Sequence, residues 1–92
     1  TVIIDEGAQK ALVRNRKSLL ASGVIGVEGY WERKDLIKIV NSGGEEIARG
    51  FAELNSEETE RAKGLRSDEI LKLFPGLKCE ELVHRDNMTV MI

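Results

Sequence analysis

The sequence predicts a mixed α+β fold: a small pseudo-barrel of about five to six strands, with a helix after the first strand and two short helices before the C-terminal strands. Three observations predict it. The 92 residues fit one domain. Short β-branched runs alternate with glycine-containing turns. Aromatic residues make up only 4% of the chain, so we expect an aliphatic core.

The N-terminal segment is typical of a strand followed by a helix. Residues 1–4 are all β-branched, which favours a short strand. Asp5 can cap a helix by accepting hydrogen bonds from the amides of its first turn. Ala8, Ala11 and Leu12 then share one helical face, which predicts a helix over residues 6–15.

The middle of the chain predicts strands joined by turns. Residues 24–27 are strand formers interrupted by glycine, which often marks a bulge or a bend in a small barrel. A charged connector follows over residues 30–35. Two strands over residues 36–40 and 46–53, joined by the Asn-Ser-Gly-Gly turn at 41–44, predict a β-hairpin.

The last third predicts two short helices and two strand segments. Asn55 or Ser56 before two glutamates is a helix start, so residues 57–63 should form a helix that Gly64 ends. Residues 67–69 repeat this start signal, and Pro75-Gly76 stops the second helix. Residues 82–92 then hold two strand segments around a polar turn.

Composition and motifs argue against catalysis in this segment. The one cysteine, Cys79, excludes an internal disulfide and a cysteine-based zinc site, and it lies beside an acid that disfavours the thiolate. His84-Arg85-Asp86 imitates a kinase catalytic loop, but the position that should hold asparagine is Met91, so a tight turn is expected. We predict no catalytic residue, metal or cofactor here, no membrane segment, and a cytoplasmic location.

A basic segment stands out against the overall balance of charges. The chain has 14 basic and 16 acidic residues, a net charge of −2, so nucleic-acid binding would need a local patch. Between Gly7 and Val27 there are four basic residues and no acids. Cations are ordinarily favoured at a helix C-terminus. The alternative is a site for phosphate or RNA formed by Arg14, Arg16, Lys17, Ser18, Gly23 and Val24.

Several of these residues together resemble the PUA domain, a small pseudo-barrel named after pseudouridine synthases and archaeosine transglycosylases. The resemblance runs from about Ile3 to Val90, and it rests on Asp5-Glu6-Gly7-Ala8, Ala11-Leu12, Lys17-Ser18-Leu19-Leu20, Ile47-Ala48-Arg49-Gly50 and Asn55-Ser56-Glu57-Glu58. The ending His84-Arg85-Asp86-Asn87-Met88, interpreted as a structural turn, resembles the C-terminal PUA domain of bacterial glutamate 5-kinases. Arg16 departs from the pattern, because related chains commonly have glycine before Lys-Ser.

The resemblance implies that residues 1–92 are one PUA domain cut from the C-terminus of a longer protein. The implied parent phosphorylates glutamate with ATP and magnesium in proline synthesis, and its kinase domain would be this domain's partner, within a homo-oligomer. PUA domains elsewhere bind structured RNA through the first helix and the strand after it. The alternative parent is an RNA-modifying enzyme of the pseudouridine synthase or transglycosylase class.

Overall fold

The computed structural model describes residues 1–76 and 81–91, and Cys79 lies outside them. In chain order the elements are β1 (Val2–Ile4), α1 (Glu6–Asn15), β2 (Leu19–Leu20), the 3-10 turn η1 (Ala21–Gly23), β3 (Val24–Val27), β4 (Leu36–Asn41), β5 (Glu46–Phe51), α2 (Ser56–Ala62), α3 (Ser67–Leu73), β6 (Glu81–Val83), the 3-10 turn η2 (Arg85–Asn87) and β7 (Met88–Val90). The predicted mixed α+β fold is confirmed. The described residues hold seven strands rather than five or six, because two-residue β2 carries no strand signal of its own.

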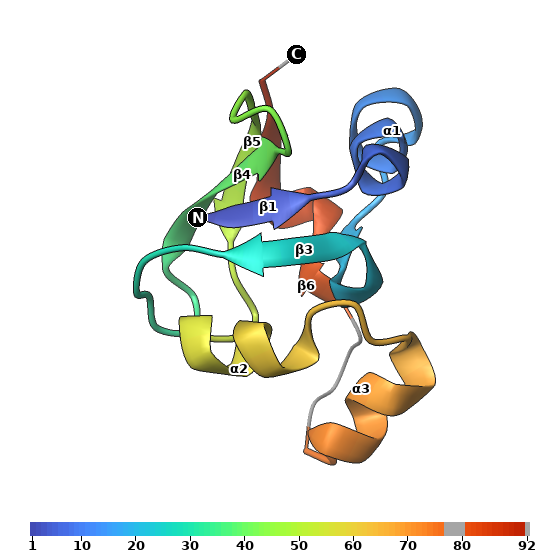
Figure 1. Ribbon diagram of the computed structural model, residues 1–92, viewed down its shortest axis with the longest axis vertical. Coiled ribbons are helices and arrows are strands. Elements are labelled where there is room, and N and C mark those ends of the chain that lie inside the picture. The colour runs from blue at the N-terminus through green and yellow to red at the C-terminus, as the bar shows by residue number, and fades with distance from the viewer. Residues whose placement is uncertain (77–80, 92) are drawn as a thin grey trace.

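The strands form two sheets. The larger has the order β3-β1-β4-β5-β7, and the smaller pairs β2 with β6. β1 runs parallel to β4 and antiparallel to β3, and the other pairs are antiparallel. In Figure 1, α1 lies at one end of the strands, while α2 and α3 lie at the other. Segments from both ends of the chain are therefore needed to complete each sheet.

The predicted hairpin is confirmed, with a bulge that the sequence pattern did not indicate. Ile39 pairs with Ala48 but Val40 pairs with Glu46, so Ile47 is an extra residue in β5. A bulge of this kind breaks the strict alternation of side chains. Ile47 and Ala48 are consequently both buried, although they are neighbours in a strand.

The predicted helix limits agree with the structure to within one residue. α1 covers residues 6–15 as expected, and the Oδ1 atom of Asp5 accepts from the Ala8 amide at 2.7 Å. α2 begins at Ser56 rather than at residue 57, with a reciprocal cap in which Asn55 and Glu58 each bond the other's backbone amide. These caps act over three residues, which is why the sequence reveals them.

The charged connector over residues 30–35 also contributes one residue, Trp31, to the core. Trp31 is 4% exposed, and its indole Nε1 donates to the Leu54 carbonyl at 2.8 Å. The core is therefore aliphatic around one buried indole. The charged neighbours stay outside: Arg33 donates from Nε to Glu58 at 2.8 Å, and this bonding lowers the pKa of the Glu58 carboxyl.

Candidate functional site

A groove of about 710 Å³ lies between α1, the segment from Lys17 to Gly23, and the start of the C-terminal turn. One wall is α1, which presents only small residues, Gly7, Ala8 and Ala11. The remaining lining residues come from three other parts of the chain: Asp5, Lys17, Ser18, Leu19, Leu20, Ser22, Gly23, Glu81, His84 and Arg85. The groove thus combines hydroxyls, two permanent cations and two carboxylates over an apolar floor.

The base of α1 is held against η1 by close backbone packing. The Asp5 amide donates to the Gly23 carbonyl at 2.9 Å. A Cβ atom on Gly23 would lie 2.5 Å from the Cβ of Ala8, closer than real Cβ contacts come. Gly23 therefore has a packing role beside the groove, because its missing side chain lets α1 sit directly on the turn.

The far wall is joined to the basic segment by one hydrogen bond. Ser18 Oγ accepts from the Arg85 amide at 2.9 Å, across 67 positions of sequence. Next to it, Leu19 of β2 pairs with Val83 of β6. The structure therefore brings together Lys17-Ser18 and His84-Arg85, and no sequence pattern had placed these two segments side by side.

The turn that supplies His84 and Arg85 is organised by local hydrogen bonds. His84 Nδ1 accepts from the Asp86 amide at 3.1 Å, and the Asn87 amide donates to the His84 carbonyl at 2.9 Å. His84 Nε2 lies 3.8 Å from the Glu81 carboxylate. The His84–Asn87 segment is thus a tight turn that also forms part of the groove wall.

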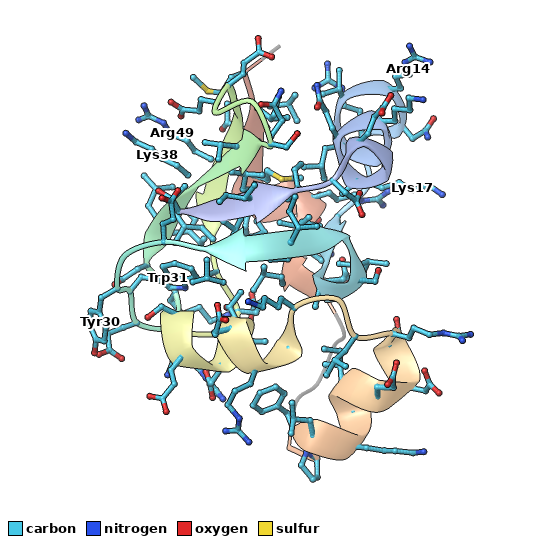
Figure 2. All side chains as sticks on the ribbon, in the orientation of Figure 1. Arg14, Lys17, Tyr30, Trp31, Lys38 and Arg49 are labelled. Carbon is cyan, nitrogen blue, oxygen red and sulfur yellow. The ribbon has the colours of Figure 1, made fainter. Side chains whose placement is uncertain are left out.

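The other residues of the expected phosphate site lie in different places. Arg14 is in the last turn of α1 and lines a second hollow, of about 480 Å³, on the other flank of that helix. Val24 is buried and paired with Ile4, so its side chain is not available to a ligand. Figure 2 shows Arg14 and Lys17 projecting on the same side of the molecule. Of the predicted site, Lys17, Ser18 and Gly23 line the groove itself.

Arg16 ends α1 in the left-handed region, with φ +50° and ψ +38°. The backbone amides of Arg16 and Lys17 both donate hydrogen bonds to the Ala11 carbonyl. Glycine adopts this conformation at little cost. The expectation that glycine is usual at this position now has a physical reason: the backbone must turn left-handed here to lead Lys17 into the groove.

Several lining residues were missed by sequence reasoning. Ser22 and Glu81 belong to no motif in the sequence, and Glu81 reaches the groove through its pairing with Leu20 of β2. Within residues 1–76 and 81–91, no group of three or more His, Cys, Asp or Glu side chains is arranged to hold a metal ion. The same part of the chain has no helix long and apolar enough to cross a membrane.

Comparison with known protein families identifies the family of this chain. A sequence model of the PUA domain matches residues 1–74. The chain belongs to the PUA family. The PUA architecture accounts for the mixed sheet, the small second sheet and the helix that follows β1.

The most similar relatives narrow the kind of PUA domain. The chain is 56% identical over 92 residues to glutamate 5-kinase of Desulfitobacterium hafniense (strain Y51), which covers all of this chain and 25% of that protein. It is 41% identical over 90 residues to glutamate 5-kinase of Caldanaerobacter subterraneus subsp. tengcongensis, covering 98% of this chain and 24% of the relative. This PUA domain is therefore homologous to the C-terminal region of glutamate 5-kinases and spans about a quarter of their length.

Solved structures agree with the fold. A PUA domain of Aeropyrum pernix K1, crystallised as a tartrate complex, superposes with a TM-score of 0.66 at 28% identity, over 91% of this chain and 40% of that one. A conserved PUA domain protein of Thermoplasma acidophilum gives 0.62 at 26% identity, over 90% and 46% of the two chains. The structural likeness is thus to PUA domains from other proteins as well.

Proposed function

We propose that this PUA domain is the accessory, non-catalytic domain of a glutamate 5-kinase. Such an enzyme transfers a phosphoryl group from ATP to the side-chain carboxylate of glutamate, the first step of proline synthesis. The observation that carries the proposal is 56% identity extending over all 92 residues. The relatives described above are glutamate 5-kinases, which favours this parent over an RNA-modifying enzyme.

The groove and its surroundings indicate which part of the polypeptide would bind ATP and Mg²⁺. The Ser18 hydroxyl of the groove accepts from the Arg85 amide, and the described residues offer no group of three or more side chains that could hold a metal ion. ATP and Mg²⁺ would therefore bind to the kinase portion, in the cytosol. The PUA domain would act on that portion through subunit contacts or through feedback by proline.

We expect glutamate-dependent ATP consumption from the complete polypeptide that contains this chain, and none above background from the 92-residue chain. The measurement is a coupled assay of ADP release, with glutamate omitted as the control. Turnover by the 92-residue chain would refute a non-catalytic role. A complete polypeptide without glutamate-dependent turnover would refute the kinase assignment.

We further propose that the groove binds the phosphates of a structured RNA. Lys17 and Arg85 supply cations to it, and Ser18 and Ser22 supply hydroxyls. The small side chains of α1 leave room for a nucleic-acid backbone to approach closely. Arg14 and Arg16 are exposed at the C-terminal end of α1, where they would extend the positive field beyond the groove.

We expect the affinity for an RNA hairpin to fall as salt rises, because bound phosphates release counterions. Lys17→Ala and Arg16→Gly should each weaken binding and reduce the slope of log K against log salt by roughly 0.7–0.9. Arg16→Gly is a clean variant, because glycine accepts the φ of +50°.

Lys72→Ala, on α3 and outside the groove lining, is the matched control and should leave the slope unchanged. The readout is a fluorescence anisotropy titration at several salt concentrations. Absence of binding at low salt would refute the RNA proposal without touching the kinase assignment. An equal loss in Lys72→Ala would show that the groove is not the site.

A further inference from the structure

The hairpin presents an exposed face that the proposed functions do not use. We call it the outer face, formed by Leu36 and Lys38 of β4 with Arg49 and Phe51 of β5. The residues between them, Ile37 and Gly50, point to the buried side. Leu36 is 58% exposed and Phe51 47% exposed, and the two are direct cross-strand partners. Contiguous exposed apolar side chains that are rimmed by charged residues are candidates for an interaction site.

The charges on this face are unbalanced. Lys38 lies directly opposite Arg49 in the hairpin, and like charges in that position destabilise a sheet. Glu46 pairs with Arg49, and that hydrogen bonding lowers the pKa of the Glu46 carboxyl. The Glu46 carboxylate is thus one negative charge beside two positive charges, those of Arg49 and Lys38 on neighbouring strands. A partner surface that brings carboxylates to Lys38 would remove the repulsion.

The outer face lies beside the start of the chain and away from the groove. β1 is hydrogen-bonded to β4, and its N-terminal end is on the same side of Figure 1 as the lower part of β4. Val2 of β1 pairs with Ile39 of β4, the residue after Lys38, so Thr1 lies at the level of Lys38. In Figure 2, Lys38 and Arg49 project to the side opposite Lys17. Any polypeptide joined to Thr1 therefore emerges next to the outer face.

We propose that the outer face docks on the kinase portion of the same polypeptide, against an apolar spot rimmed by carboxylates. This inference rests on the proposed kinase parent, whose relatives are about four times as long as this chain. Interfaces between domains of one chain bury about 600–1,500 Å² and are more polar than obligate interfaces. Two apolar side chains flanked by two cations match that composition. The groove and the outer face would then point in different directions, so a ligand in the groove and the kinase portion could be bound at the same time.

Hydroxyl-radical footprinting followed by mass spectrometry tests this directly. The oxidation rates of Leu36 and Phe51 are compared in the complete polypeptide and in the 92-residue chain, with Leu71 of α3, also exposed, as the internal control. We expect severalfold protection of Leu36 and Phe51 in the complete polypeptide, and no change at Leu71. Equal rates in the two samples overturn the proposal. Protection that appears in the 92-residue chain as its concentration rises also overturns it, since the occupant would then be a second copy.

A charge reversal tests the acidic partner surface. Lys38→Glu in the complete polypeptide should reduce the protection of Phe51, whereas Lys72→Glu should leave it intact. Circular dichroism of both variants shows whether the domain still folds. If Phe51 is equally protected in Lys38→Glu, the proposal that carboxylates rim the partner surface is overturned. Glutamate kinase activity of the same samples is also measured. Activity without protection of Leu36 and Phe51 would refute the docking of the outer face, whereas absence of activity would refute the kinase assignment.

Discussion

Gly50→Ala is expected to destabilise the domain by about 2–4 kcal/mol, among the largest effects of a single methyl group in this chain. Gly50 lies in β5 where β6 and the C-terminal turn pass over it. A Cβ atom there would overlap Cγ1 of Val83 and would lie 2.9 Å from the Asn87 carbonyl oxygen and 3.2 Å from the Cβ of Met88. The carbonyl belongs to backbone, so the strain cannot be relieved by turning one side chain.

Thermal unfolding followed by circular dichroism measures this effect. A loss of this size corresponds to a fall of roughly 10 °C or more in Tm for a domain of this length. Gly76→Ala is the matched control, because a Cβ atom there meets nothing within 4 Å. Adding Val83→Ala to Gly50→Ala should recover only part of the loss, since the contact with Asn87 remains. Equal Tm values for Gly50→Ala and Gly76→Ala would contradict the packing described here.

Trp31→Ala is expected to cost about 3–5 kcal/mol, the usual loss when a buried aromatic ring is truncated. The indole is the one large aromatic group among the buried core residues, and its removal leaves a cavity beneath α2. It also leaves the Leu54 carbonyl without its 2.8 Å donor. An unsatisfied buried carbonyl costs about 1–3 kcal/mol by itself.

Urea unfolding followed by circular dichroism tests this prediction, because the variant lacks the only tryptophan. Trp31→Phe keeps most of the buried ring and loses the hydrogen bond, so it should fall between wild type and Trp31→Ala. Tyr30→Ala, next in sequence but 80% exposed, should change stability by less than about 0.5 kcal/mol. If Tyr30→Ala were as damaging as Trp31→Ala, the connector would not be anchored by the indole.

The Gly50 variant also bears on the groove, whereas Trp31 anchors the connector to α2. The turn above Gly50 carries His84 and Arg85 into the groove wall. The cap of α2 meets the connector at Trp31, whose amide donates to Ser56 Oγ at 3.2 Å. Loss of stability and loss of ligand binding should therefore occur together in Gly50→Ala, whereas Lys17→Ala should weaken binding without lowering Tm.

The sequence by itself determined the local elements of this protein. Asp5 and Asn55 cap helices through bonds that reach three residues, and the Asn-Ser-Gly-Gly turn joins strands that are neighbours in the chain. Such interactions join residues that are close together in the sequence, so pattern and spacing reveal them. The resemblance of scattered motifs to the PUA domain, now confirmed, added the family.

Only the tertiary structure decided which of these elements meet. The Ser18–Arg85 hydrogen bond spans 67 positions, and β2 becomes a strand only because β6 lies beside it. Trp31 has charged neighbours in the sequence, yet the packing of its connector against α2 buries it. These contacts depend on the simultaneous packing of distant segments, and no local pattern records them. The groove arises at this level, from residues whose neighbours in space are far away in the chain.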